Sequence, residues 1–138
     1  MIRLLLLFLV LVSAKAHAQT GAPRIGKHAI SLQWISWEKP GSAQITKAKD
    51  GTYRIVGRQR SDDRQDSLRI DGRLTVISPK ELRFKGKIIT RIHHIHEGAP
   101  CLREGDYTFL ITGKRRYWRL QEMLNCSGVE TDYVDIYF

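Results

Sequence analysis

The sequence contains few of the residues that build disulfide-rich or metal-clustered small proteins. Among its 138 residues there are two cysteines, too few for the framework of a toxin or growth factor and too few for a cysteine-only zinc site. No phosphate-binding loop, no nucleophile paired with a base and no acid–base carboxylate pair stands out. The sequence therefore predicts no catalytic residue and gives no positive indication of an enzyme.

Long hydrophobic runs are also scarce, and the clearest one occupies residues 4–12. Arg3 precedes this run and residues 16–18 follow it as a small-x-small cleavage site, which is the arrangement of a secretory signal peptide. Nine apolar residues fall short of the roughly 20 that a membrane-spanning helix needs, which disfavours the alternative of a retained anchor. We expect residues 1–18 to be removed and the protein to be exported, either to the periplasm or out of the cell.

Acidic residues are in the minority. The chain has 23 Lys and Arg against 14 Asp and Glu, a net charge of +9. With 42% hydrophobic and 27% charged residues, its composition excludes both a disordered segment and a protein with repeated membrane spans. Its length allows one domain, so we expect a single modest core beneath a basic surface.

What the sequence has in abundance is alternation of apolar and polar residues. Apolar residues and glycine occupy nearly all even positions from 68 to 76 and from 82 to 92, while polar or charged residues fill most odd positions. A period of two is typical of a strand with one buried face. No segment shows a convincing helical stripe, so the fold is predicted to be built from strands.

The two alternating segments predict a hairpin. Pro79 lies in the connection between them, where it suits a turn. The resulting register places Gly72 opposite Gly86, and two facing glycines permit the sharp bend that closes a small barrel. The alternative is that residues 71–72 form a tight turn of their own, which would split the first strand.

A second hairpin is predicted around a two-residue turn at residues 113–114. In this register Phe109 lies opposite Trp118. The same register places Cys101 opposite Cys126, which together with export favours one structural disulfide.

The remaining segments complete a closed meander. Residues 50–51 (Asp-Gly) predict another tight turn, and residues 30–34 and 134–138 alternate like strands. A last strand needs a partner, which the first strand supplies if the sheet closes. We predict an all-β fold, an antiparallel meander of about eight strands closed or nearly closed into a small β-barrel with one disulfide. The barrel is expected over residues 30–138, after an irregular lead-in over residues 19–29.

Four segments, IDGRL, FKGKI, TGKRRYWRLQEM and DYVDIYF, resemble those of small exported bacterial proteins of unassigned function, over residues 31–138. The meander is also similar to lipocalin-like barrels in general, although neither Trp34 nor Trp37 belongs to a Gly-x-Trp signature. Neither resemblance assigns a role to a residue.

The interior of a barrel of about eight strands can be filled by side chains or can hold one small ligand. The facing glycines would leave some volume open, so an apolar-ligand pocket competes with a filled core. The aromatic residues predicted inside, and hence as ligand contacts, are Trp34, Tyr53, Phe84, Tyr107, Phe109 and Trp118.

Basic residues collect on the outward positions of three successive predicted strands. Like charges opposed across strands are unfavourable, so an anionic envelope component such as lipopolysaccharide phosphate, an anionic lipid headgroup or a polyanionic polymer would relieve them. Nucleic acid is not expected as a partner outside the cell, and the alternative is a merely solvated face. The predicted anion-binding residues are Arg54, Arg58, Arg69, Arg73, Arg83, Lys85, Lys87 and Arg91. Arg60 is predicted to point outward on the same face, and Asp71 interrupts these cations.

A histidine cluster occupies residues 93–96. If the preceding strand continues, His94 and His96 project to one side, where they could bind a zinc or copper ion. The same parity would point both imidazoles inward at the barrel mouth, where they could contact a ligand. Ordinary strand-end histidines are the third interpretation.

These features predict an exported, non-enzymatic β-barrel that binds a small apolar or amphipathic ligand or an anionic envelope component. Contact with the envelope would be peripheral and not membrane-spanning. The alternatives are a periplasmic protein-interaction or inhibitor module and a metal-binding protein that uses the histidine cluster.

Overall fold

The computed structural model describes residues 22–138, so the predicted signal peptide and the start of the predicted lead-in lie outside the described residues. In this part of the chain no helix is long and apolar enough to span a bilayer. The elements are β1 (Gly26–Leu32), β2 (Gly41–Lys47), β3 (Tyr53–Arg60), β4 (Ser67–Ser78), β5 (Glu81–Arg91), the short 3-10 helix η1 (His96–Gly98), β6 (Cys101–Leu110), β7 (Tyr117–Leu120) and β8 (Val134–Tyr137).

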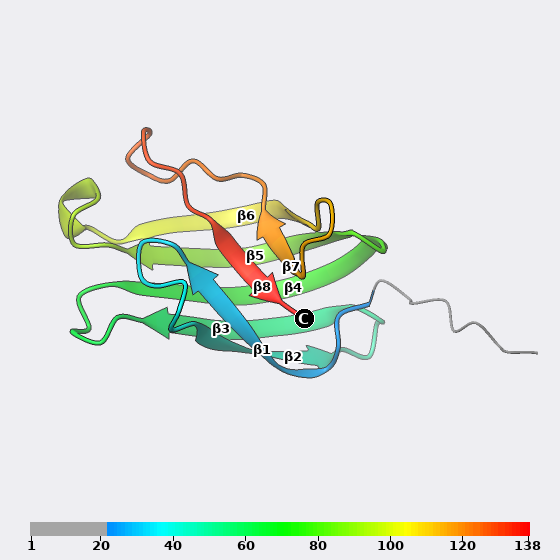
Figure 1. The fold of residues 1–138 in the computed structure, drawn as a ribbon. Coiled ribbons are helices and arrows are strands. Elements are labelled where there is room, and N and C mark those ends of the chain that lie inside the picture. The colour runs from blue at the N-terminus through cyan, green and yellow to red at the C-terminus, as the bar shows by residue number, and fades with distance from the viewer. Residues whose placement is uncertain (1–21) are drawn as a thin grey trace, which may run out of the picture.

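The eight strands form a closed barrel in chain order. Each strand pairs antiparallel with the next, and β8 pairs with β1 through Ile30 opposite Ile136 and Leu32 opposite Val134. In Figure 1, β8 accordingly lies between β1 and β7. The predicted all-β, closed meander is confirmed, and closure leaves the first and last strands paired with each other.

The first strand begins earlier than predicted. The sequence pattern suggests irregular chain through residue 29, whereas β1 starts at Gly26. His28 pairs with Ala43 of β2, and its buried Nδ1 lies 2.6 Å from the carbonyl oxygen of Tyr137. The pairing of β1 with β2 uses backbone N–H and C=O groups and does not require alternating apolar side chains. The sequence pattern therefore does not predict the first residues of β1.

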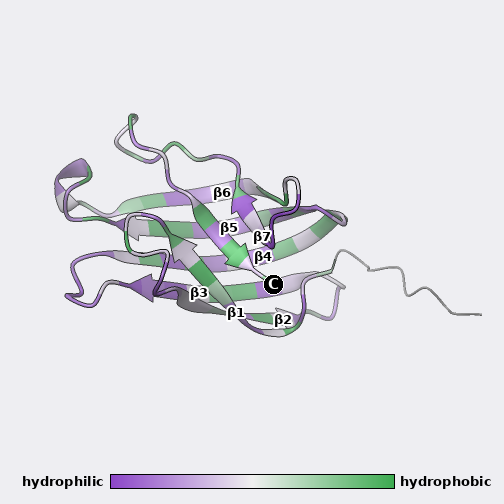
Figure 2. Ribbon diagram, viewed as in Figure 1, coloured by the Kyte–Doolittle hydropathy of each residue, from purple (hydrophilic) through white to green (hydrophobic). Residues whose placement is uncertain are grey.

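Alternation along the strands builds the core. Strand β4 buries Leu68, Ile70 and Leu74 and exposes Arg69 and Arg73. Figure 2 shows this alternation as hydrophobic and hydrophilic bands along the long strands. The large side chains that are fully buried are Phe84, Phe109, Ile30, Leu32, Ile45, Ile55, Leu68, Ile70, Leu74, Leu82, Ile88 and Leu120.

The β4–β5 hairpin has the predicted register. Gly72 lies opposite Gly86, Leu74 lies opposite Phe84, and β4 runs through this level without a turn. A Cβ atom at Gly72 would lie 2.5 Å from the carbonyl oxygen of Lys85 and 2.5 Å from Cε2 of Phe84. The Phe84 ring therefore fills the space that the facing glycines leave, and the glycines allow close packing without opening a cavity.

The β6–β7 hairpin differs from the prediction. The turn at Gly113 is present, with a positive φ of 59°, but Phe109 lies opposite Leu120 and not opposite Trp118. The ladder does not run directly from the turn, because the N–H of Ile111 donates instead to the β4–β5 connection, at 2.8 Å from a carbonyl oxygen. The predicted register is therefore wrong.

The predicted disulfide between Cys101 and Cys126 is confirmed. Cys101 begins β6, and Cys126 lies in the loop between β7 and β8. Because the β6–β7 register is not the predicted one, hairpin alignment does not explain the bond. The pairing follows more simply from the chain having these two cysteines and no others.

Candidate anion-binding site

Three arginines line one pocket on the outer face of the barrel. Arg58 and Arg60 come from β3, and Arg69 comes from β4. The pocket has a volume of about 490 Å³, within the range of roughly 300–1,000 Å³ that is usual for small-molecule sites. We refer to it as the arginine pocket. Its other lining residues are Ser42, Gln44, Val56, Gly57, Gln59, Ser67 and Leu68.

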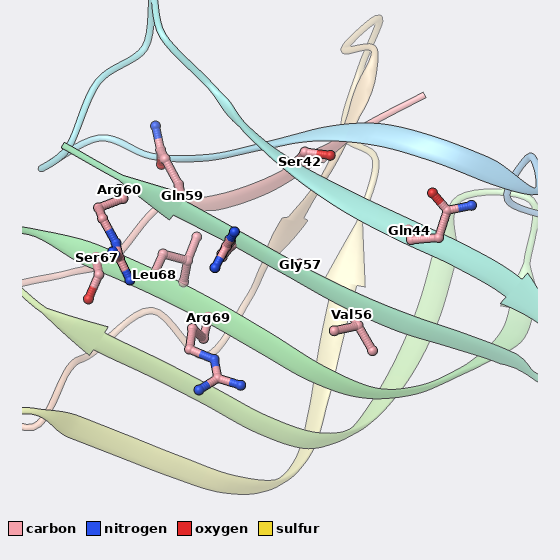
Figure 3. A pocket seen from close by; sticks show the side chains of 10 residues that line it. Ser42, Gln44, Val56, Gly57, Gln59, Arg60, Ser67, Leu68 and Arg69 are labelled. Atoms are coloured by element: carbon pink, nitrogen blue, oxygen red, sulfur yellow. The ribbon is translucent and has the colours of Figure 1, made fainter. Parts of the chain in front are cut away.

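Strand geometry brings the three guanidinium groups to one face. Residues 58 and 60 are two apart on β3 and so project to the same side, and Arg58 lies directly opposite Arg69 in the β3–β4 ladder. All three residues are exposed. Figure 3 shows β3 crossing the middle of the site, with Ser42 and Gln44 on β2 to one side and Arg69 on β4 to the other.

The arginine pocket lacks negative charge. None of its lining residues is acidic, and within residues 22–138 no carboxylate forms a salt bridge with Arg58, Arg60 or Arg69. Like charges opposed on neighbouring strands destabilise a sheet. An anion bound between these side chains would supply the missing counter-charge.

The neighbouring part of the predicted basic face is different, because its arginines are paired. Arg54 lies 2.5 Å from Asp71, and Arg73 lies 3.0 Å from Asp50. The pKa of Asp50 lies below its usual value, chiefly because Thr52 donates hydrogen bonds to its carboxylate, with Arg73 adding to the effect. These cations already have partners within the protein.

Strand β6 adds further acidic residues to the same face. Asp106 lies opposite Lys85, and Glu104 lies opposite Lys87. Asp71 is therefore not the one acidic residue on this face, as the sequence suggested. The two further carboxylates come from β6, which lies beside β5. Of the predicted basic residues, Arg83 and Arg91 are exposed toward the two ends of β5, outside the arginine pocket.

Buried contacts hold the arginine pocket in place from beneath. Gln59 is 2% exposed; its Oε1 accepts a hydrogen bond from the N–H of Leu32 at 2.7 Å, and its Nε2 donates to the carbonyl of Ser36 at 2.9 Å. A Cβ atom at Gly57 would lie 2.5 Å from Cβ of Ala43, so β2 and β3 approach closely there. The backbone that carries the arginines is therefore fixed by the interior.

The histidine cluster does not adopt the predicted arrangement. Strand β5 ends at Arg91, and the chain then turns, so His94 and His96 do not share a strand face and both are exposed. Ile92 and Ile95 take the buried positions instead. In the described part of the chain, no three His, Cys, Asp or Glu side chains are grouped to hold a metal ion. Zinc or copper binding at this cluster thus gains no geometric support.

The aromatic residues predicted inside the barrel divide into two groups. The Phe84 ring packs on Phe109 at 5.9 Å and on Tyr107 at 6.2 Å between centroids, so these rings contact one another and do not surround a ligand-sized space. Tyr53, Phe84, Phe109 and Trp118 are buried in the core, whereas Trp34 and Tyr107 are partly exposed and pack against it.

The sequence did not reveal that Asp132, just before β8, is fully buried. Its carboxylate accepts hydrogen bonds from Nε1 of Trp34 at 3.1 Å, Nδ2 of Asn125 at 3.3 Å and Nη2 of Arg103 at 3.3 Å. Burial raises the pKa of Asp132, although these hydrogen bonds and the Arg103 charge act in the opposite direction. The contacts tie the β7–β8 loop to β6 and lie away from the arginine pocket.

Asp135, on β8, is a second buried carboxylate that the sequence did not reveal. Both of its oxygens accept hydrogen bonds from the Arg119 guanidinium at 2.7 Å, and this bonding raises the pKa of Arg119. The guanidinium also lies 4.4 Å from the ring centroid of Tyr133 and 5.1 Å from that of Tyr117. Arg119 is therefore committed to internal contacts and is not a free cation.

Comparison with known proteins gives the chain a family. The model of the PM1083 family matches residues 13–138. The chain belongs to the PM1083 family. It is 42% identical over 114 residues to "Uncharacterized protein PM1083" of Pasteurella multocida (strain Pm70), an alignment that covers 83% of this chain and 72% of that protein. No solved structure gives a significant match.

Membership in the PM1083 family confirms the predicted resemblance to small proteins of unassigned function. Neither the family description nor the name of the relative states an activity.

Proposed function

We propose that this protein is an exported, non-enzymatic β-barrel that binds a phosphate-bearing envelope component, such as an anionic lipid headgroup, at the arginine pocket. The observation that carries the proposal is the grouping of Arg58, Arg60 and Arg69 around one pocket with no acidic lining residue. Guanidinium groups suit phosphate because their planar donors match its oxygens.

Export is the second part of the proposal. Its supports are the signal-peptide pattern of residues 1–18 and the Cys101–Cys126 disulfide, since disulfides persist mainly in oxidising compartments. A periplasmic or secreted location would place the barrel beside the anionic lipids and polymers of a bacterial envelope. Mass spectrometry of the protein made from the full coding sequence tests this part, because cleavage after residue 18 gives a defined mass.

The packing of the core favours an anion over an apolar ligand inside the barrel. Phe84 fills the level of the facing glycines, and its ring contacts Phe109 and Tyr107. An interior ligand would have to displace these side chains, whereas the arginine pocket is open to solvent and already formed. The geometry thus supports a surface anion site better than a lipocalin-like interior site.

Vesicle binding tests the arginine pocket. The probe is a phosphatidylcholine vesicle with and without phosphatidylglycerol, and the variant is R58Q/R60Q/R69Q. Each cation near an anionic surface contributes about 1 kcal/mol, so we expect the variant to bind phosphatidylglycerol vesicles about a hundredfold more weakly. Binding of the natural protein should also weaken as salt is added.

A matched variant separates the arginine pocket from net charge. K27Q/K47Q/K49Q removes three exposed cations that do not line the arginine pocket. It should retain most of the vesicle binding. Equal weakening of both variants would show attraction to net charge alone, and failure of the natural protein to bind phosphatidylglycerol vesicles would overturn the proposal.

A protein-interaction module is the second candidate, and the β7–β8 loop favours it. The Cys101–Cys126 disulfide and the Leu124–Thr131 bridge constrain this loop, which projects beyond the strands in Figure 1. Leu124 is 56% and Val129 is 79% exposed, and constrained loops with exposed apolar tips suit recognition by another protein. Recovery of a stoichiometric envelope protein by the natural chain, but not by V129D, would support this role.

A further inference from the structure

A second pocket opens at one end of the barrel, where the β4–β5 connection, the β6–β7 loop and the end of the chain meet. We refer to it as the mouth pocket, and its volume is about 520 Å³. In Figure 1 the β4–β5 connection and the β6–β7 loop lie together at the right-hand end of the barrel. No residue of the arginine pocket lines it.

Part of the lining of the mouth pocket is apolar. Ile111, Trp118 and Phe138 all line it, and the Trp118 and Phe138 rings pack edge to face with centroids 4.8 Å apart. Phe138 is 44% exposed, so apolar surface remains in contact with solvent at this end of the barrel. Covering it with an alkyl chain would remove that surface from water.

Another part of the lining is basic. Lys80, Lys114 and Arg115 line it together with Arg24, and none of the lining residues is acidic. Within residues 22–138 none of these four cations forms a salt bridge. Arg24 donates to the carbonyl of Lys27 at 2.8 Å, and the Arg115 guanidinium lies 5.7 Å from the ring centroid of Tyr117. Because Arg115 is exposed and its contact is with a ring and not with a carboxylate, it remains, with the two lysines, a cation that can meet a ligand.

Trp118 supplies an independent indication of a ligand. The residue is 3% exposed, and its buried Nε1–H has no hydrogen-bond partner within the described residues. A buried donor without an acceptor is costly, and nearly all such groups in proteins are satisfied. Trp118 lines the mouth pocket, but its Nε1 has almost no exposed surface. A ligand oxygen therefore accepts this hydrogen bond only if the side chains that cover the indole shift when the ligand binds.

From the apolar lining residues, the basic lining residues and the indole N–H that has no partner among the described residues, we propose that the mouth pocket binds an amphipathic anion, an alkyl chain that carries one anionic head. The chain covers Ile111 and Phe138. The head meets Lys114 and Arg115 and accepts the N–H of Trp118. This site is separate from the arginine pocket, and its occupation does not depend on the function proposed above.

NMR of the tryptophan indole N–H groups tests this site in the protein produced from the full coding sequence. The probes are laurate and dodecyl phosphate, below their micelle concentrations, and dodecyltrimethylammonium as a cation with the same chain. We expect both anions to shift the Trp118 indole signal strongly, because it gains an acceptor. The Trp34 indole is already bonded to Asp132 at 3.1 Å and should not move.

The probes also distinguish two sources of the anionic head. A stronger response to laurate than to dodecyl phosphate would assign the site to fatty carboxylates, and the reverse would assign it to alkyl phosphates. Equal binding of dodecyltrimethylammonium would overturn the requirement for an anion. An unmoved Trp118 signal with all three probes would overturn the site, as would concentration-dependent dimerisation that perturbs the same signal without ligand.

Charge reversal gives the matched comparison. K114E/R115E should weaken laurate binding at least about tenfold, as expected when charge-assisted hydrogen bonds are lost. K47E/K49E changes the net charge equally at exposed positions that do not line the mouth pocket, and it should bind laurate like the natural protein. Equal affinity of both variants would overturn the proposed head-group contact, and W118F, which keeps a ring but lacks the N–H, should bind more weakly.

Discussion

The two sides of the barrel are held together in different ways. From β2 to β6 the strands are long and alternating apolar side chains face one core, whereas β7 and β8 have four residues each. The short strands are reinforced by a disulfide, the Arg119–Asp135 pair and the buried Asp132 carboxylate. Short strands bury little apolar surface, so these polar contacts and the disulfide hold the neighbouring loops in place. On the short-strand side Arg119 and Asp132 are thus committed to internal contacts, whereas on the long-strand side Arg58, Arg60 and Arg69 form no salt bridge within residues 22–138.

The largest difference between the two sides should appear when an ion pair is broken. D135A leaves Arg119, whose side chain is 13% exposed, without its carboxylate. Removing one partner of a buried pair costs about 3–5 kcal/mol because the remaining charge stays desolvated. Urea denaturation of D135A should show a decrease of this size in the free energy of unfolding.

The matched variant on the long-strand side is D71A. It breaks the Arg54–Asp71 pair, whose side chains are 52% and 43% exposed. Exposed pairs contribute less than about 1 kcal/mol, so unfolding should change little. If D135A and D71A lowered the free energy of unfolding equally, ion pairs would stabilise the two sides of the barrel to the same extent, contrary to this prediction.

Removing the disulfide should have the next largest effect. The bond joins residues separated by 25 positions, and the loop-entropy relation gives about 3 kcal/mol for a loop of this size. We expect C101S/C126S to unfold at correspondingly lower urea concentration, with the β6 and β7–β8 loop amides losing hydrogen-exchange protection before those of β4. Uniform loss of protection in all strands would show that the disulfide supports the whole barrel equally.

On the long-strand side, Gly72 should be sensitive to substitution. In G72A the new Cβ would lie 2.5 Å from the Lys85 carbonyl oxygen and the Phe84 ring, and overpacking of this kind costs about 1–3 kcal/mol. T75A, at an exposed position of the same strand, is the control and should be nearly neutral. If G72A left the free energy of unfolding unchanged, β4 and β5 would be able to move apart at this level without a cost in stability.

The smallest effect concerns pH. Because the folded state raises the pKa of Asp132, it holds this proton where the unfolded chain has released it. The resulting stabilisation is present at low pH and is lost as pH rises through the raised pKa. D132N cannot titrate, so its Tm relative to the natural protein should rise over this acidic range.

Asp63 provides the opposite case for comparison. Its pKa is lowered, mainly by the Ser61 hydroxyl, so its contribution is lost as pH falls. D63N should therefore show a pH trend of opposite sign and, because Asp63 is exposed, of small size. Calorimetry across the acidic range measures both trends, and a D132N profile parallel to that of the natural protein would show that burial does not perturb Asp132.

The long-strand side could be predicted from sequence almost completely. Alternation, together with the turn at Pro79, fixed the β4–β5 register and the opposition of Gly72 and Gly86. On the short-strand side the same reasoning gave a wrong partner for Phe109, because the N–H of Ile111 donates to the carbonyl of Lys80 and not across the hairpin. The predicted placement of His94 and His96 on one strand face was also wrong, because β5 ends at Arg91.

The sequence by itself determined the order of the strands and the faces of the alternating side chains on β3, β4 and β5, because a period of two is a local property of the chain. It also determined the disulfide, because the chain has a single pair of cysteines. Only the tertiary structure decided which cations lack partners. Asp50 pairs with Arg73, and Glu104 and Asp106 lie opposite Lys87 and Lys85. Within residues 22–138, Arg58 and Arg69 have no carboxylate at salt-bridge distance. The mouth pocket likewise exists only after closure, because its lining comes from segments that the barrel brings together from opposite ends of the chain.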